Sequence, residues 1–303
     1  MTRRSDQIFF YTLRVIALTV ICIFASLVWQ LYGLSAAALN EFGLDFFSQN
    51  VWNPVLDKYG ALAFIWGTVA SSIIALIIAV PISVGTALLL TEVAPRWVRQ
   101  PIGFLVEMLA AIPSVVYGLW GIFVLAPIVR NFIQPPLAKY FGDWTIFSGP
   151  PFGLGLLTAG IILAIMITPT IAAITREVFS AIPKIQREGA LALGATRWEA
   201  IRLAVLKPGM PGIFSAVVLG LGRALGETMA VTMVIGNRSD ISMSLFKPAA
   251  TMASVIANEY SEAGSDLHLS ALSAVGLTLL AMSLVVYLIA RSIVRLGFRK
   301  AAR

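Results

Sequence analysis

Long runs of apolar residues dominate the chain, and short polar segments separate them. Six of these runs reach the roughly 20 residues that a helix needs to cross a bilayer. They lack the alternation of apolar and polar residues that is typical of a membrane β-strand. Because helices and closed barrels alone satisfy their backbone groups within lipid, the pattern predicts an all-α integral membrane protein. The predicted spans are residues 15–35, 62–90, 102–129, 152–174, 212–236 and 269–290.

The composition supports this prediction. The 303 residues are 58% hydrophobic and 12% charged, whereas soluble domains are about 45–50% apolar and about 25% charged. A water-soluble core could not bury so much apolar surface, so we expect a multi-pass protein of the cell inner membrane, with lipid as a partner.

The basic residues give the predicted orientation. Sixteen of the 22 Lys and Arg residues lie at one set of span ends, and five lie at the other. By the positive-inside rule, the richer side, which includes both termini, is cytoplasmic. This placement accounts for the net charge of +7, and we therefore expect no nucleic-acid partner. The richer side carries Arg3, Arg4, Arg14, Arg96, Arg99, Arg176, Lys184, Arg187, Arg197, Arg202, Lys207, Arg291, Arg295, Arg299, Lys300 and Arg303.

The first apolar run, between Arg3-Arg4 and Ser35-Ala-Ala-Ala38, is similar to a signal peptide with its cleavage site. It is longer than the usual core of about 7–15 residues, so we predict a retained helix. The predicted organisation is an N-terminal transmembrane helix with an outer loop at 1–61, a five-helix core at 62–290, and a basic cytoplasmic tail at 291–303.

The segment at about 180–208 predicts two short helices. Ser180-Ala-Ile-Pro183 is typical of a helix start, and Gly194 of a helix end. Thr196 and Glu199 then form a Thr-x-x-Glu capping box, which begins a second helix that runs to Lys207-Pro208. We call this pair of helices, at about 180–208, the elbow. From these residues alone, the elbow either lies on the membrane surface or docks on a partner.

The same segment resembles the EAA loop of ABC-importer permeases. The resemblance rests on Glu188-Gly189-Ala190, on Gly194, and on Val205-Leu-Lys-Pro208. It departs from the pattern at Gly189, where Ala is usual, and at Pro208, which comes one residue late. The resemblance implies that the loop docks on an ATP-binding subunit, through Glu188, Gly189, Ala190 and Gly194.

A nucleotide-binding motif is missing. No G-x-x-x-x-G-K-[ST] occurs, and no Gly is followed by Lys, so the chain has no phosphate-binding loop of that type. We expect a permease subunit that is not an enzyme and carries no cofactor, with ATP and Mg bound by a partner ATPase.

Two charged residues interrupt the fifth predicted span. A helix over 212–236 places Arg223 about 16 Å from its start, near the middle of the membrane. Glu227 follows four positions later, on the same helix face, where the two side chains are expected to pair. Gly222 and Gly226 form a step that allows another backbone to approach closely. The pair either locks two helices together or lines the route of an anion, because guanidinium binds oxyanions through two parallel hydrogen bonds.

These residues also carry a resemblance to the permeases of the phosphate-specific ABC importer, PstC-type. It rests on Gly222-Arg-Ala-Leu-Gly-Glu-Thr-Met-Ala-Val231, Ile235-Gly-Asn237, Ile112-Pro-Ser-Val-Val-Tyr-Gly118 and Thr91-Glu-Val-Ala-Pro95. It covers roughly 60–290 and implies the six-helix fold of a type I ABC importer permease. We take Arg223, Glu227, Thr228, Ser114 and Tyr117 as the candidate substrate path.

The resemblance implies an ATP-driven importer of inorganic phosphate. Its expected partners are a second homologous permease, two ATP-binding subunits and an extracytoplasmic phosphate-binding protein. Sulfate, molybdate or another oxyanion remains an alternative cargo, and an ion-coupled secondary transporter is an alternative class. The lone His268 is expected to be a wetted loop residue, and no metal site is predicted.

Overall fold

The computed structural model describes residues 2–299, without the side chains of 2–6, 8, 96 and 293–299. Lys300 and Arg303 of the predicted basic tail lie outside these residues, and α14 runs through the described part of that tail. Six helical stretches of the described chain are long and apolar enough to cross a membrane, which confirms the all-α prediction. They are Phe9–Phe42, Leu62–Val93, Ser114–Phe141, Leu156–Ala181, Arg197–Gly226 and Asp266–Ser292.

The α-helices and strands are α1 (Thr2–Phe42), α2 (Asp45–Ser48), β1 (Trp52–Asn53), β2 (Lys58–Tyr59), α3 (Leu62–Leu88), α4 (Arg96–Ala111), α5 (Ser114–Trp120), α6 (Ala126–Ile128), α7 (Gln134–Phe141), α8 (Leu156–Ala181), α9 (Lys184–Ala192), α10 (Arg197–Ile201), α11 (Lys207–Gly226), α12 (Met229–Val234), α13 (Met252–Glu259) and α14 (Asp266–Arg299). Between them lie the π-helical segments η1 (Leu89–Val93), η2 (Gly121–Leu125), η3 (Val129–Ile133) and η5 (Arg202–Leu206), and the 3₁₀ turns η4 (Thr145–Phe147) and η6 (Tyr260–Glu262). The two short strands pair antiparallel, with Trp52 opposite Tyr59.

Helix α8 lies at the centre of the bundle and packs against both α3 and α11. Glycines allow these close approaches, since a Cβ on Gly160 would meet Ile74 of α3. A Cβ on Gly220 of α11 would likewise meet Ile171 of α8 at 2.6 Å. Small residues at helix contacts are the usual means of association in lipid, where apolar burial alone gives no drive.

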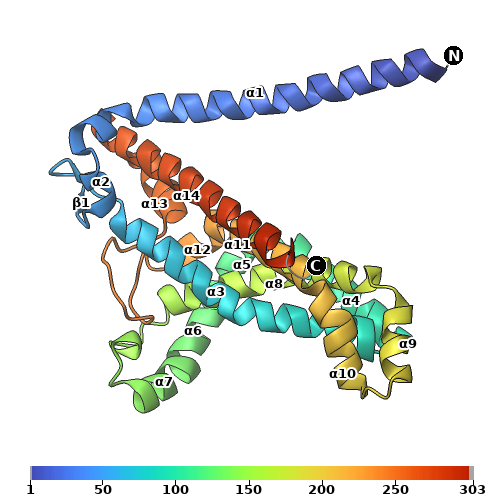
Figure 1. Cartoon of the computed structure of the whole chain (residues 1–303). Helices are drawn as coiled ribbons and strands as arrows, with labels where there is room; N and C mark the ends of the chain where they lie inside the picture. The colour runs from blue at the N-terminus through green and yellow to red at the C-terminus, as the bar shows by residue number, and fades with distance from the viewer. Residues whose placement is uncertain (1, 300–303) are drawn as a thin grey trace.

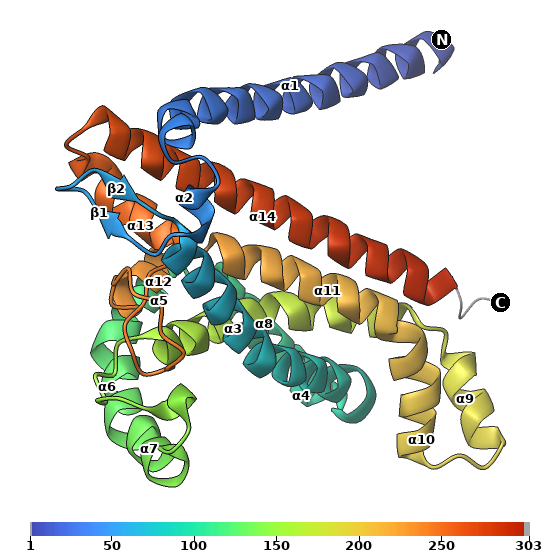
Figure 2. The same cartoon turned by 60° about the vertical axis from the view of Figure 1, so that its left-hand side comes forward.

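Helix α1 packs along α14 near the strand end of the bundle and diverges from the body toward Thr2 (Figures 1 and 2). Ala38 is buried there, and its backbone N–H donates to Ser270 Oγ at 3.0 Å. Both views place the described ends of α1 and α14 toward the end of the bundle that carries α9 and α10. The strands and α13 lie at the opposite end.

The prediction for His268 was wrong, because its side chain is buried rather than wetted. Its Nε2 lies 3.0 Å from Glu259 Oε2, and its ring stacks on Tyr59 with centroids 5.3 Å apart. The Trp52 indole donates to the same carboxylate oxygen at 2.8 Å. Burial, aided by the neighbouring Asp57, raises the pKa of the Tyr59 hydroxyl to about 12. No local pattern indicates this cluster, since Trp52 and Glu259 are 207 positions apart along the chain.

The third span also differs from its prediction at 102–129. Residues 96–111 form the separate helix α4, and the span begins only at Ser114. Ile112 has an extended backbone (φ −67°, ψ 129°). A proline disfavours the helical conformation of the residue before it, so Pro113 here ends a helix, whereas Pro81 and Pro169 lie inside α3 and α8.

Candidate functional site

The helix that carries Arg223 ends three residues later, so the fifth span is not the continuous helix predicted at 212–236. Glu227 is extended (φ −69°, ψ 125°), and α12 starts only at Met229. Local bonds stabilise this break: the Ala230 N–H donates to Glu227 Oε1 at 3.4 Å, and the Thr228 hydroxyl donates to Gly226 O at 3.3 Å. Such side-chain bonds to nearby backbone compete with helical ones.

The predicted ion pair between Arg223 and Glu227 is therefore not formed. The helix break removes the i, i+4 register on which the pairing depended. Instead, Arg223 Nη1 donates to Thr170 Oγ1 of α8 at 3.0 Å. Among the described side chains, no carboxylate lies within 4.0 Å of the Arg223 guanidinium. Arg223 is half-buried, and its partner in this chain is a neutral hydroxyl.

A second helix break, between α4 and α5 at Ile112-Pro113, lies beside the first. Helix α5 packs against α12, and Gly118 makes this contact possible, because a Cβ there would meet Met233 Sδ and would lie 3.1 Å from Ala230 Cα. This packing places α5, which carries the predicted path residues Ser114 and Tyr117, next to α12, the helix that follows the break after Arg223. Irregular backbone is tolerated at membrane depth where it is buried in protein or lines a cavity.

Of these α5 residues, Tyr117 is buried. Its hydroxyl donates to Leu109 O at 2.8 Å, a carbonyl in the last turn of α4 that has no partner within its own helix. Ser114 begins α5 and is half-buried. Tyr117 thus holds the two sides of the α4–α5 break together.

The glycine step next to Arg223 makes no close contact within this chain. Gly222 and Gly226 are both exposed, and a Cβ on either would meet nothing within 4 Å. The close approach of another backbone predicted there is therefore not made by any described part of this chain.

The elbow predicted at about 180–208 is confirmed as two short helices that project together from one end of the bundle (Figure 2). Gly194 has φ +86°, and the N–H groups of Gly194 and Ala195 donate to Leu191 O and Ala190 O. This is the glycine helix stop of a Schellman motif. The capping box is present in both directions, with Thr196 N–H donating to Glu199 Oε2 at 2.8 Å.

The second elbow helix does not stop at Lys207-Pro208, as predicted, but continues through η5 into α11. Pro208 is the second residue of α11, directly after the π-helical turn η5. The elbow is thus joined directly to α11, the helix that carries Arg223. Along this helix, Arg223 lies about 24 Å from Lys207.

The predicted ATPase-coupling residues lie on the outer surface of the elbow. Glu188, Gly189 and Gly194 are exposed, and Ala190 is half-buried. Several apolar side chains around them are also exposed: Ile185 (74%), Leu193 (91%) and Trp198 (61%). An exposed apolar surface of this kind is typical of a contact site for a protein or a membrane.

Sequence reasoning missed two contacts of this region. It missed Thr170, the partner of Arg223, although a hydroxyl one residue after Pro169 is a visible signal. It also missed that Glu107 on α4 pairs with Arg176 on α8, with Nη2 and Oε1 2.7 Å apart. That contact joins residues 69 positions apart, and no local pattern encodes it.

Residues 79–296 match the family described as binding-protein-dependent transport system inner membrane component. Two bacterial proteins named phosphate transport system permease protein PstC are similar to nearly the whole chain. The one from Mesorhizobium japonicum is 48% identical and the alignment covers 95% of this chain and 89% of that protein. The one from Pasteurella multocida is 48% identical, with 98% and 94% covered. A probable PstC of Methanocaldococcus jannaschii is 38% identical, with 95% and 93% covered.

Two solved structures share the fold. A chain of a bacterial alginate ABC transporter, in complex with an alginate-bound periplasmic protein, superposes with a TM-score of 0.64 at 17% identity, covering 97% of this chain and 98% of that one. A chain of the MetNI methionine ABC transporter in an inward-facing conformation gives 0.58 at 17% identity, covering 81% and 98%. The fold is thus that of ABC importer permeases.

Proposed function

The chain belongs to the family of binding-protein-dependent transport system inner membrane components, and we propose that it is the permease subunit that carries inorganic phosphate inward past Arg223. The main observation in support is that Arg223 lies in a membrane-spanning helix next to two helix breaks, with the neutral Thr170 hydroxyl as its partner. A guanidinium at this depth is costly unless it faces a cavity or a counter-charge. An oxyanion supplies that counter-charge and matches the planar fork of donors.

The choice of phosphate over other oxyanions rests on the names of the relatives. Arg223 and the hydroxyls of Thr170, Thr228 and Ser114 suit any tetrahedral oxyanion, so sulfate or molybdate is the second candidate. In this proposal, gross selectivity belongs to an extracytoplasmic phosphate-binding protein.

The proposed complex contains this chain, a second homologous permease, two ATP-binding subunits and the binding protein. The elbow and both termini face the cytoplasm, in line with the excess of Lys and Arg on that side. The exposed apolar side chains of the elbow support docking on an ATP-binding subunit, which holds ATP and Mg. The helix that continues from the elbow to Arg223 supports the transmission of its movement to the path.

The test is phosphate uptake by cells that lack their own importer and express the complete complex. We expect Arg223→Gln to reduce uptake by at least about 100-fold, a loss of about 2.7 kcal/mol of transition-state binding. Arg14→Gln is the matched control, because Arg14 is exposed on α1. Assembly and ATP hydrolysis are measured in parallel.

Three results would contradict the proposal. Unchanged uptake in Arg223→Gln would make the residue a structural contact with Thr170. Equal loss in Arg14→Gln would indicate a nonspecific charge effect. Wild-type cells that import sulfate or molybdate but no phosphate would reassign the cargo.

A further inference from the structure

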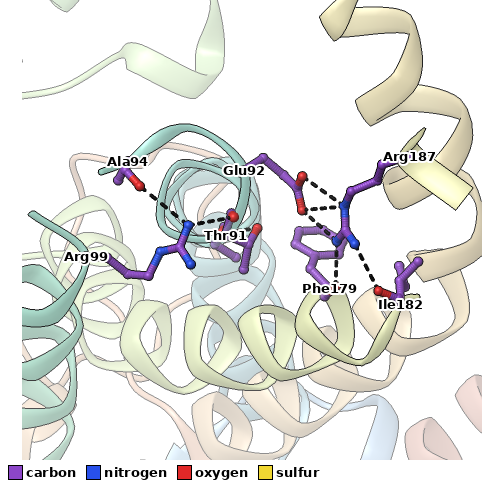
Figure 3. Close-up of polar contacts among 8 residues, drawn as sticks. Thr91, Glu92, Ala94, Arg99, Phe179, Ile182 and Arg187 are labelled. Atoms are coloured by element: carbon purple, nitrogen blue, oxygen red, sulfur yellow. Dashed lines mark hydrogen bonds and ion pairs between the residues drawn. The ribbon is translucent and has the colours of Figure 1, made fainter. Parts of the chain in front are cut away.

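Arg187 on α9 joins the elbow to the ends of two membrane helices (Figure 3). Its Nε and Nη2 donate to both carboxylate oxygens of Glu92 in η1, at 2.7–3.1 Å. Its Nη2 and Nη1 also donate to Phe179 O and Ile182 O, both at 2.9 Å, at the end of α8. Four of the five N–H groups of the guanidinium are used, in the two-point geometry that fixes direction as well as distance.

The contact is shielded from water. The side chains of Arg187 and Glu92 are 19% and 10% exposed, whereas the exposed pair Arg238–Asp240 is 66% and 69% exposed. Shielded pairs of this kind are screened little by salt, while exposed ones contribute almost nothing. The carbonyls that Arg187 covers lie at the C-terminus of α8, where a cation is favoured, and that of Phe179 also accepts from the Ile182 N–H.

Apolar packing does not hold α9 in this position. Helix α9 buries none of its nine residues. Among its described side chains, that of Arg187 is the one with hydrogen bonds to other elements. The contact between Arg187 and Glu92 also borders a hollow of about 440 Å³, which these two residues and Arg99 line in part. The second arm of the elbow reaches the same helices by apolar packing, with Val205 in a buried cluster with Ala87 of α3 and Phe179 of α8. For α9 itself, the polar hold on the ends of α3 and α8 comes from Arg187.

Glu92 is itself held in place. It lies in η1, the π-helical turn that ends the α3 span, and Arg99 Nη2 donates to Thr91 O at 2.9 Å across the following bend (Figure 3). The carboxylate is thus presented by the helix end itself rather than by a mobile loop.

We propose that the Glu92–Arg187 pair is the clamp that makes the elbow and the adjoining ends of α3 and α8 move as one body. Arg187 and Glu92 are positioning residues in this inference, which rests on the proposed function: ATP-driven displacement of the elbow reaches α3 through the clamp, in addition to α11. Without the clamp, the elbow follows the ATPase while α3 lags behind, so ATP is hydrolysed with little transport.

The first test compares phosphate uptake with ATP hydrolysis in the assembled complex. We expect Glu92→Gln and Arg187→Gln each to lower uptake per ATP hydrolysed about 5- to 20-fold, the lower part of the range of typical couplings between sites. ATP hydrolysis itself should change less than about twofold. The double variant should be no worse than Arg187→Gln alone, because that variant has already lost the contact with Glu92 as well as those with Phe179 O and Ile182 O. Arg187→Lys should recover part of the lost uptake per ATP, since the lysine ammonium keeps the positive charge but not the planar two-point hydrogen-bond geometry of guanidinium.

Asp240→Asn is the control, because it removes an equivalent carboxylate from an exposed arginine outside the elbow. Unchanged coupling in Glu92→Gln, additive losses in the double variant, or the same loss in Asp240→Asn would each overturn the clamp. Loss of assembly in step with loss of uptake would also overturn it, since the pair would then only support folding.

A second test is independent of cargo, so it remains decisive if the complex transports no phosphate. Spin labels are placed at Gln186→Cys on α9 and Val93→Cys in η1, both exposed positions, in a Cys22→Ser background with cysteine-free partners. We expect the distance between labels to stay constant when ATP is bound with hydrolysis blocked, and to shift or broaden in Glu92→Gln. Equal nucleotide-dependent changes in both proteins would contradict rigid coupling.

Discussion

Arg223 donates a hydrogen bond to Thr170 Oγ1 at 3.0 Å, which joins the last turn of α11 to α8 one residue beyond Pro169. The bond holds the cation in one orientation without neutralising it. We expect Thr170→Val to weaken phosphate uptake about 3- to 10-fold, less than Arg223→Gln, because a hydrogen bond to a charged group contributes about 1.5–3 kcal/mol in total but the charge itself remains.

Thr168→Val is the matched control for that prediction. Its hydroxyl bonds only to Ala164 O of its own helix, so its loss leaves the arginine untouched. Equal effects of the two substitutions would show that packing in α8, rather than the orientation of the guanidinium, determines the outcome.

Gly118 is expected to tolerate no larger residue. A Cβ there would meet Met233 Sδ and Ala230 Cα, so Gly118→Val should cost about 1–3 kcal/mol through overpacking of α5 on α12. Thermal unfolding of the purified complex measures this loss, and Met233→Ala should restore part of it. Gly85→Ala, in α3 with nothing within 4 Å, should leave the midpoint unchanged or raise it.

The turn between the elbow helices depends on one backbone conformation. Gly194 has φ +86°, which costs a residue with a Cβ about 1–2 kcal/mol. Gly194→Ala should therefore loosen the elbow, and limited proteolysis should show faster cleavage near residues 193–196. Gly194→Asn should behave closer to wild type, since asparagine tolerates this region better. Equal protection of all three proteins would contradict a strained turn.

The buried cluster at the strand end of the bundle should depend on Glu259. Its carboxylate accepts from the Trp52 indole and lies against His268, so Glu259→Leu leaves buried polar groups without partners. We expect a loss of about 1–3 kcal/mol in the free energy of unfolding. Trp52→Phe with Glu259→Leu should lose less than the sum of the two single changes, and strict additivity would show that the bond does not matter.

The same cluster gives a pH dependence. Because the Tyr59 pKa is raised by burial to about 12 from its usual 10, the native state keeps this proton longer than the unfolded state. The stability linked to Tyr59 is fully present below about pH 10 and is lost as the pH rises toward 12. Tyr59→Phe should flatten the fall in unfolding midpoint over this range.

The sequence was sufficient for features that local patterns encode. Long apolar runs predicted six spans, and Thr196 with Glu199 predicted a capping box that the structure confirms. It failed where a helix had to break inside an apolar run. Glu227 leaves the helix because its carboxylate and the Thr228 hydroxyl bond to nearby backbone, which a count of apolar residues cannot register.

Long-range contacts were equally hidden. Glu92 and Arg187 are 95 positions apart, and each looks like an ordinary charged residue at a span end. Only the packing of α3 beside α8 brings them together. Likewise, the i, i+4 spacing predicted an ion pair between Arg223 and Glu227, whereas in the packed structure Arg223 bonds to Thr170 of α8.

The neutral partner of Arg223 also has an electrical consequence. An anion that enters a cell with a negative interior moves against about 2.3 kcal/mol per charge for each 100 mV. A carboxylate paired with Arg223 would neutralise the guanidinium and so remove the attraction that it offers to an anion on the proposed path. If the anion passes Arg223 as proposed, a guanidinium beside a neutral hydroxyl provides a favourable binding position partway across, so that the anion crosses in two shorter steps.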